Sequence, residues 1–357
     1  MHSINRHRKD DHLTEALSQQ SEIQYSSFDD IRFIHHSLGT ISADEISLET
    51  EWAGVHHPLP IYINGMTGGT HRSYRYNQLL AEVARETGIA MASGSMSIAL
   101  KQIDDRETLE SFTIIRKTNP DGFVMANLGA GHSLDNARRV VEILEADALQ
   151  IHLNRPQEVI MPEGDRDFSK WHENIAAIVE GIDVPVIVKE VGFGMSRQTI
   201  ETLINLGVRT IDLSGRGGTN FAKIENNRRQ ALDLSRLTSW GQTTAESLLE
   251  SIPFQKRAEI LASGGVRDYF DMTRALALGA RATGISGHIL NIVDQGGTQA
   301  GIDFIEQTRH GLAQTFLLLD VRNIHELQSS DYILTGALRE WAIERNISLN
   351  QSILTLH

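Results

Sequence analysis

The stretch Ile151 to Phe168, IHLNRPQEVIMPEGDRDF, places four polar side chains directly behind a short apolar run. These are His152, Asn154, Gln157 and Glu158. The run itself, residues 147–153, is flanked by helical patterns, so we expect a buried parallel strand with polar groups at its carboxyl end. α/β enzymes keep their chemistry at that end. A carboxylate beside an amide suits Mg²⁺, which one or two carboxylates typically hold together with substrate phosphates.

The acidic residues that follow, Glu163, Asp165 and Asp167, have two interpretations. They could order a turn before the next helix, or they could act directly on a ligand. For these three residues the turn is the favoured interpretation. For Gln157 and Glu158 we favour a direct role.

Composition excludes several classes of function. The 357 residues carry a formal net charge of -13, which repels the phosphate backbone of nucleic acids. The chain has no cysteine, so there is no disulfide, thiolate nucleophile or zinc-thiolate site. No apolar stretch approaches the roughly 20 residues that span a bilayer. Because no apolar region follows the basic N-terminus, we expect a cytoplasmic protein without a secretory signal.

Eight apolar runs alternate with helix-period segments from residue 60 onward. This rhythm predicts an α/β fold of the TIM (β/α)8 barrel type, with residues 1–57 as an N-terminal arm and lead-in and 58–357 as barrel and C-terminal helices. A long insertion, 220–255, follows strand six. The eight expected strands are 61–63, 89–92, 123–126, 148–153, 184–188, 210–213, 259–262 and 282–285.

Each expected strand ends in glycine, amide, hydroxyl or charged residues. The turns after strands seven and eight, residues 263–268 and 286–288, lie where barrels bind phosphate, because bare N–H groups and a helix N-terminus converge there. A single glycine turn would only indicate turn chemistry. Four such loops on one face favour a phosphorylated cofactor. Lys189, at the end of strand five, would face the other end of that cofactor and stabilise an anionic reduced flavin.

The N-terminal cluster RHRKDDH is ambiguous from the residues alone. It could be a solvated tail. Equally, Arg8 and Lys9 could clamp a phosphate, since arginine binds phosphate in a bidentate manner and lysine acts as a point charge.

Several motifs together resemble the type II isopentenyl-diphosphate isomerases, the flavin-dependent isomerases of isoprenoid biosynthesis, over essentially the whole chain. They are RKDDH, NGMTGG, ANLG, QIHLNxxQE with MPEGDRDF, PVIVKEVGFG, DLSGRGGTNF, ASGGVRD and TGISGH. The resemblance implies a TIM barrel, FMN, Mg²⁺, NADPH or another reductant, and a homo-tetramer or octamer.

The resemblance also assigns residues. Gln157 matches the catalytic glutamine, Glu158 the Mg²⁺ ligand, and His152 and Asn154 line the same pocket. The substrate diphosphate would contact the arm residues Arg8, Lys9 and His12, with Gln157 and the strand-two loop Ser95, Met96 and Ser97. Residues at FMN-binding positions are Met66, Thr67, Gly68, Ser95, Asn127, Lys189, Ser214, Thr219, Gly264, Gly265, Val266, Arg267, Ser286 and Gly287.

One departure concerns the strand-two loop. Many family members read Gly-Ser-Gln-Arg there, whereas Met96 and Ser97 follow Ser95 in this chain. An arginine contact to the diphosphate is thereby lost from this loop, which makes Arg8 and Lys9 more important.

The implied reaction is a 1,3-allylic proton shift between isopentenyl and dimethylallyl diphosphate. It needs a strong acid and a nearby base, for which reduced flavin with Gln157 and Lys189 would serve. An alternative is an FMN-dependent oxidoreductase of the hydroxy-acid oxidase or dihydroorotate dehydrogenase type, which would leave Gln157 and Glu158 unexplained. A non-catalytic flavin carrier would need neither Mg²⁺ nor a cationic arm.

Overall fold

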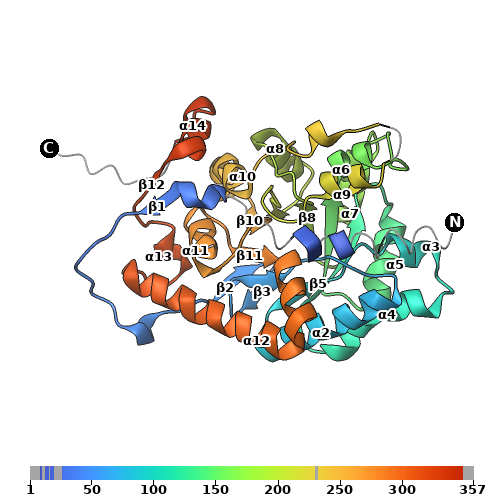
Figure 1. Ribbon diagram of the computed structural model, residues 1–357, viewed down its shortest axis with the longest axis horizontal. Helices are drawn as coiled ribbons and strands as arrows, with labels where there is room; N and C mark the ends of the chain where they lie inside the picture. The colour runs from blue at the N-terminus through green and yellow to red at the C-terminus, as the bar shows by residue number, and fades with distance from the viewer. Residues whose placement is uncertain (1–8, 10–12, 16, 20–25, 230–231, 349–357) are drawn as a thin grey trace.

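The computed structural model describes residues 9, 13–15, 17–19, 26–229 and 232–348. Its centre is a closed barrel of eight parallel strands in the order β10-β11-β4-β5-β6-β7-β8-β9 (Figure 1). The predicted barrel is therefore confirmed. The strands are β4 (Ile61–Ile63), β5 (Ala90–Ala92), β6 (Val124–Gly129), β7 (Ala148–Leu153), β8 (Val186–Glu190), β9 (Thr210–Asp212), β10 (Glu259–Ser263) and β11 (Ala282–Ile285).

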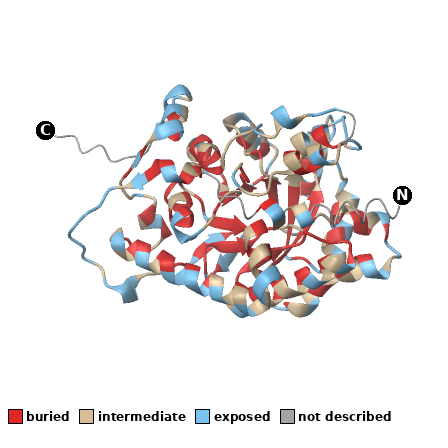
Figure 2. Ribbon diagram, viewed as in Figure 1, coloured by how far each residue is buried: buried red, intermediate tan, exposed pale blue. Residues whose placement is uncertain are grey.

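A covering helix follows each barrel strand, and buried residues concentrate on the strands and on the inner helix faces (Figure 2). Several helices begin at a side-chain cap, as Thr70 accepts from Ser73 N and Asp268 from Asp271 N. The covering helices are α2 (His71–Thr87), α4 (Arg106–Thr118), α5 (Leu134–Leu144), α7 (Trp171–Gly181), α8 (Arg197–Asn205), α10 (Thr244–Ser251), α11 (Tyr269–Ala277) and α12 (Gly287–Leu318), the last kinked at Gly297.

Shorter helices lie in the connections. Three of them, α3 (Ser97–Lys101), α6 (Arg155–Ile160) and α9 (Phe221–Asn227), follow strands at the barrel's carboxyl end. Beyond the barrel come α13 (Ile324–Leu327) and α14 (Gly336–Glu344). Single 3-10 turns are η1 (Ser27–Asp30), η2 (Ala43–Glu45), η3 (Ser235–Leu237) and η4 (Ile252–Phe254).

The segment before the barrel closes its N-terminal end. A hairpin of β2 (Thr50–Trp52) and β3 (Val55–His57) inserts Trp52, which is fully buried among inward residues of the strands. Ala53 N donates to Glu259 Oε2 at 2.8 Å, and the His57 ring stacks on Trp52 with centroids 4.1 Å apart. Trp52 and His57 therefore fill the N-terminal end of the barrel, which we call the base. A ligand site can form only at the opposite, carboxyl end.

The lead-in also binds the end of the described chain. Strand β1 (Ile31–Phe33) pairs antiparallel with β12 (Tyr332–Leu334), and Leu338 N donates to Asp30 Oδ2 at 3.2 Å. Among the described residues, no helix has both the length and the apolar character needed to cross a membrane.

Five of the eight barrel strands differ from the prediction at one or both ends, and β6 and β8 differ most. Residues 127–129, expected as a loop, are the end of β6 because they pair with β7 as far as Gly129 and His152. The fifth barrel strand begins at Val186 and not at residue 184. Pro185 has no N–H to donate, and its carbonyl accepts from Leu149 N at 2.9 Å just before the strand. The same strand ends at Glu190 and not at residue 188, so Lys189 and Glu190 lie inside it.

Candidate active site

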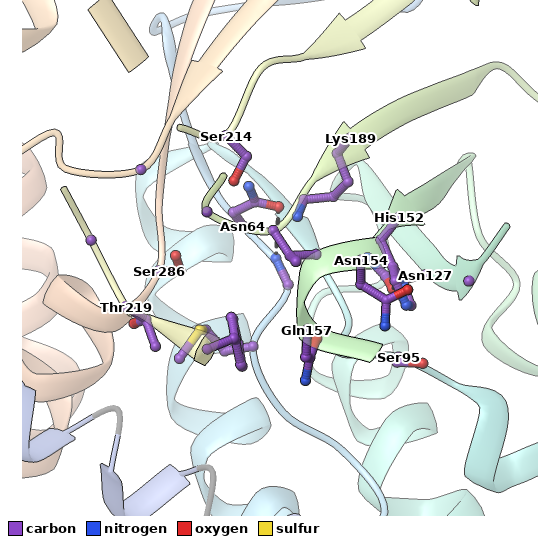
Figure 3. Close-up of a pocket in the computed structure, with 18 of the residues that line it drawn as sticks. Asn64, Ser95, Asn127, His152, Asn154, Gln157, Lys189, Ser214, Thr219 and Ser286 are labelled. Atoms are coloured by element: carbon purple, nitrogen blue, oxygen red, sulfur yellow. Dashed lines mark hydrogen bonds between the residues drawn. The ribbon is translucent and has the colours of Figure 1, made fainter. Parts of the chain in front are cut away.

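The carboxyl end of the barrel opens into a cavity of about 520 Å³. Loops from all eight strands contribute to its wall, as does Lys9 of the arm. In Figure 3, Thr219 and Ser286 lie on one side of the cavity, while Ser95, Asn127 and His152 lie on the other. Most predicted site residues line it: Lys9, Met66, Thr67, Ser95, Ser97, Asn127, His152, Asn154, Gln157, Glu158, Lys189, Ser214, Thr219, Gly264, Gly265, Val266, Arg267, Ser286 and Gly287.

Two predicted residues do not line the cavity, and two others lie outside the described residues. Gly68 packs against Phe112, where an added Cβ would lie 2.0 Å from a ring carbon, and it does not line the cavity. Met96 is fully buried in the core because its side chain points away from the cavity that Ser95 and Ser97 line. Arg8 and His12 fall outside the described residues.

The phosphate end of the cavity is a set of closely packed glycine turns. Gly264 and Gly265 have φ values of +88° and +74°, in the region that favours glycine. An added Cβ at Gly264 would lie 2.1 Å from Gly215 O. Ser286 directly precedes α12, so the N-terminus of that helix faces the cavity. Such a helix end favours an anion.

Thr219 supplies an unsatisfied polar atom at this end. Its hydroxyl is buried and has no hydrogen-bond partner among the described residues. A buried hydroxyl without a partner is costly, so a polar ligand atom would stabilise it. The glycine turns, the helix N-terminus and this hydroxyl together fit a cofactor phosphate.

Arg267 lines the same end, but its side chain is engaged elsewhere. The guanidinium donates to Asp271 Oδ2 at 2.7 Å and to Asp29 Oδ1 at 2.8 Å. The hydrogen bond to Asp271, together with that to Asp29, raises the pKa of Arg267. Arg267 therefore joins the strand-seven loop to η1, and its role as a cofactor contact stays a prediction.

Lys189 and His152 occupy the cavity floor at matching positions of neighbouring strands. Burial lowers the pKa of Lys189, while Asp212 and Glu190 oppose that shift. Burial, reinforced by Lys189, lowers the pKa of His152 to about 3, so the imidazole is neutral near pH 7. The floor therefore presents one lysine and one neutral imidazole.

Gln157 and Glu158 sit on α6, directly after β7. Gln157 Nε2 donates to Glu225 Oε1 at 3.2 Å, and Glu225 is a buried carboxylate of α9. Glu158 accepts from Asn154 Nδ2 at 2.7 Å and from Asp165 N at 2.8 Å. Gln157 is thus held by the insertion after β9, and Glu158 by its own loop.

Glu158 is the candidate metal ligand. The described residues contain no cluster of three or more histidine or acidic side chains arranged for a metal ion. A single protein carboxylate fits Mg²⁺ when substrate phosphates and waters complete the coordination sphere. The arrangement is therefore compatible with a metal that is shared with a phosphorylated ligand.

The wall opposite the phosphate end carries a second polar group. Lys9 Nζ donates to Ser95 O at 3.0 Å, which brings the arm over the cavity. Ser97 Oγ lies 3.1 Å from Ser95 Oγ and 2.9 Å from His132 Nε2. Of the two interpretations of the arm, this contact favours a clamp over a solvated tail at Lys9.

In the acidic turn after α6, Glu163 and Asp165 line the cavity, while Glu163 and Asp167 also make contacts that order the loop. Glu163 Oε1 accepts from Arg228 at 2.8 Å, and Asp167 Oδ1 caps Ser169 N at 2.9 Å. These contacts support the turn interpretation for Glu163 and Asp167, and the role of Asp165 stays a prediction.

Comparisons with known proteins place the chain in a family. Isopentenyl-diphosphate delta-isomerase of Staphylococcus epidermidis is 46% identical over 344 residues, which cover 96% of this chain and 97% of the relative. The enzyme of the same name from Staphylococcus aureus is 43% identical over the same length and with the same coverage. The chain belongs to the isopentenyl-diphosphate delta-isomerase family.

The family model described as FMN-dependent dehydrogenase also matches, over residues 152–335 of this isomerase-family chain. Among solved structures, the flavin-binding domain of baker's yeast flavocytochrome b2 has a TM-score of 0.63 and 19% identity, covering 88% of this chain and 77% of the other. A mandelate oxidase has a TM-score of 0.62 and 17% identity, covering 87% and 90%. At such identities the likeness confirms the barrel fold alone. The resemblance inferred from the motifs is confirmed by the relatives, and so is the expectation of an enzyme.

Several polar residues of this isomerase-family site were not predicted. Asn64, Gln150, Asp212 and Ser263 form hydrogen bonds beneath the floor, and Glu225 holds Gln157. A signal for the first four exists in the sequence, because each is a polar residue at an inward position of an apolar strand. Glu225 lies in the insertion, where no period of two or 3.6 marks its direction.

Proposed function

We propose that this enzyme interconverts isopentenyl and dimethylallyl diphosphate by a 1,3-allylic proton shift, with FMN in the glycine-lined cavity. The observation that carries the proposal is that Gln157, which lies between Thr219 and Ser95 in Figure 3, and Glu158 line the same cavity as the glycine turns and Lys9. Relatives of this name and the FMN-dependent family model support it.

Residues in different parts of the cavity would have different roles. The glycine turns and Thr219 would hold the cofactor phosphate, and Lys189 would face the flavin ring. When bound, reduced FMN would supply the acid and base for the alkene. Gln157, whose amide both donates and accepts hydrogen bonds, would align the alkene and relay a proton.

The diphosphate would be held away from the reacting carbons. Lys9 at the arm and Mg²⁺ on Glu158 would bind it on the side of the cavity that Ser95 and Ser97 line. Fixing the charged end places the alkene reproducibly, which is the contribution that orientation makes to rate.

The proposal also covers the reductant of FMN, the oligomeric state of the protein and its place in the cell. NADPH would reduce FMN, the protein would assemble as a tetramer or octamer, and it would act in the cytoplasm. Light scattering of the purified protein measures the assembly, and NADPH-dependent bleaching of flavin absorbance measures the reduction.

The deciding experiment is an anaerobic incubation with isopentenyl diphosphate, FMN, NADPH and Mg²⁺, followed by product analysis. Dimethylallyl diphosphate that requires FMN and Mg²⁺ supports the proposal. Oxidation of a 2-hydroxy acid or dihydroorotate, without isomerisation, would instead establish the oxidoreductase alternative. Flavin binding without either reaction would leave a flavin carrier.

A further inference from the structure

Five inward-facing side chains form a continuous chain of hydrogen bonds at the floor of the cavity, which three of them line. His152 Nδ1 lies 2.8 Å from Asn127 Oδ1, and Asn127 Nδ2 lies 3.0 Å from Gln150 Oε1. Gln150 Nε2 lies 3.1 Å from Asn64 Oδ1, and Asn64 Nδ2 lies 2.8 Å from Asp212 Oδ2. All but His152 are buried, so bulk water does not compete for these bonds. We call this chain the amide relay.

The direction of the amide relay is fixed at its Asp212 end. Asn64 Oδ1 accepts from Gly65 N at 2.9 Å, and a backbone N–H can only donate. The Asn64 amide nitrogen therefore faces Asp212, whose carboxylate also accepts from Ser263 Oγ at 2.8 Å. Two independent contacts thus set the orientation of the Asn64 amide.

That orientation propagates to His152. Since the Asn64 oxygen faces Gln150, the Gln150 nitrogen must donate to it, and the Gln150 oxygen must turn to Asn127. The Asn127 nitrogen then donates, and its oxygen faces the imidazole. An oxygen acceptor at 2.8 Å requires a proton on His152 Nδ1.

The other imidazole nitrogen faces the cavity. His152 and Gly129 both line it, and an added Cβ at Gly129 would lie 3.2 Å from His152 Nε2. A side chain at position 129 would therefore cover this nitrogen, which the glycine leaves open. Because the imidazole is neutral, only one nitrogen carries a proton, and Nε2 keeps its lone pair.

We propose that Asp212 is a positioning residue that, through the amide relay, holds His152 as the Nδ1–H tautomer, so that Nε2 would accept a hydrogen bond from an N–H or O–H group of bound FMN, because the isopentenyl group carries no such donor. His152 is then an acceptor and not a cation for the diphosphate. The proposal rests on the proposed function only for FMN as the ligand.

The tautomer is measured directly on protein labelled with 15N-histidine at pH 7, using two-bond ¹H–¹⁵N correlations and His152→Gln for assignment. The wild-type spectrum should show protonated Nδ1 and bare Nε2. In Gln150→Met, which cannot donate or accept strongly, the ratio of Nε2–H to Nδ1–H should rise by about tenfold, because one ordinary hydrogen bond no longer favours Nδ1–H. Ser111→Ala is the matched control, since it removes a buried side-chain hydrogen bond, the one from Gly69 N at 2.7 Å, that involves no member of the amide relay; its tautomer should match the wild type.

A binding readout separates this inference from the proposed function. Gln150→Met should raise the FMN dissociation constant by about tenfold, the effect of one misdirected hydrogen bond, while KM for isopentenyl diphosphate at saturating FMN stays unchanged. An inactive wild type with the expected spectrum would sink the proposed function and leave the tautomer assignment intact. Protonated Nε2 in the wild-type spectrum would overturn the inference even if Gln150→Met failed to fold, and so would an unchanged tautomer ratio in a folded Gln150→Met.

Discussion

The two ends of one barrel interior differ in chemistry although the same strands build both. At the base, Trp52 belongs to one buried cluster with Tyr62, Met125, Ile187 and Leu261. Two residues further along each strand, the inward positions hold Asn64, Asn127, Lys189 and Ser263, which lie below or beside the cavity. Inward positions recur every second residue. Two residues along a strand are therefore enough to pass from the apolar base to the polar cavity wall.

This difference predicts that substitutions at the base and at the mouth, the carboxyl end that carries the cavity, affect different properties of the protein. The base fills volume with apolar and aromatic atoms, so changes there should alter the free energy of unfolding. The mouth orders polar groups around an open volume, so changes there should alter turnover or binding. Variants that violate this division would refute it.

The largest effect is expected at Gln157. Gln157→Ala removes the amide that aligns the alkene, so turnover should fall by roughly two to four orders of magnitude, the range for a lost proton-transfer group. FMN affinity should stay unchanged, as measured by flavin fluorescence. Glu158→Gln is the neighbouring control, and high Mg²⁺ should rescue it partly. Rescue of Gln157→Ala by Mg²⁺, with none for Glu158→Gln, would mean that the two roles are reversed.

At the base, Trp52→Ala should destabilise the protein by about 3–5 kcal/mol, because it leaves a cavity in the barrel interior. Chemical denaturation measures the loss. Below the unfolding transition, the kcat of this variant should remain close to that of the parent. A large loss of kcat with unchanged stability would show that the base shapes the site directly.

A smaller effect is expected where the arm meets the mouth. Lys9→Ala should raise KM for the diphosphate substrate, since a lost charge-assisted hydrogen bond costs about 1.5–3 kcal/mol. Lys256→Ala is the matched control, because Lys256 is exposed and does not line the cavity. Equal kinetics for the two variants would restore the solvated-tail interpretation.

The smallest effect is expected in the pH dependence of stability and concerns His57, the histidine of the base. Burial lowers the pKa of His57 to about 4. Its depressed value means that the unfolded chain binds more protons between pH 6.5 and 4, so stability is lost as pH falls through that window. His57→Phe keeps an aromatic ring on Trp52 and should flatten this part of the Tm-against-pH curve. An unchanged acid limb would place the charging group elsewhere.

The sequence was sufficient for the barrel and for most of the cavity wall. The alternation of apolar runs with helix-period segments predicted the eight strands of the barrel. The glycine and amide residues at the strand ends lie around one cavity. The amide relay was not predicted, because pairing Gln150 with Asn64 depends on how side chains meet across the barrel, which no local pattern specifies. Met96 was misplaced because neighbouring residues of a short loop can point in opposite directions.

Contacts between residues far apart in the chain were also not predicted, because no local sequence pattern specifies them. The family resemblance places Arg267 among the FMN-binding positions, but it did not predict that the guanidinium pairs with Asp29, which lies more than two hundred residues earlier. Glu225 reaches Gln157 from the insertion, whose local sequence has no strand or helix period that would aim it at the site. Both contacts follow from the tertiary fold and not from spacing in the chain.

The central claim, that residues of the mouth move a proton at the substrate alkene without net redox change, is tested by isotope incorporation. The fully loaded enzyme, with reduced FMN and Mg²⁺, is incubated with isopentenyl diphosphate in deuterium oxide under anaerobic conditions. Dimethylallyl diphosphate should carry deuterium from solvent, and the rate of incorporation should fall in parallel with turnover in Gln157→Ala. Product that forms at the normal rate without solvent deuterium, or deuterium uptake that is unaffected by Gln157→Ala, would contradict the account.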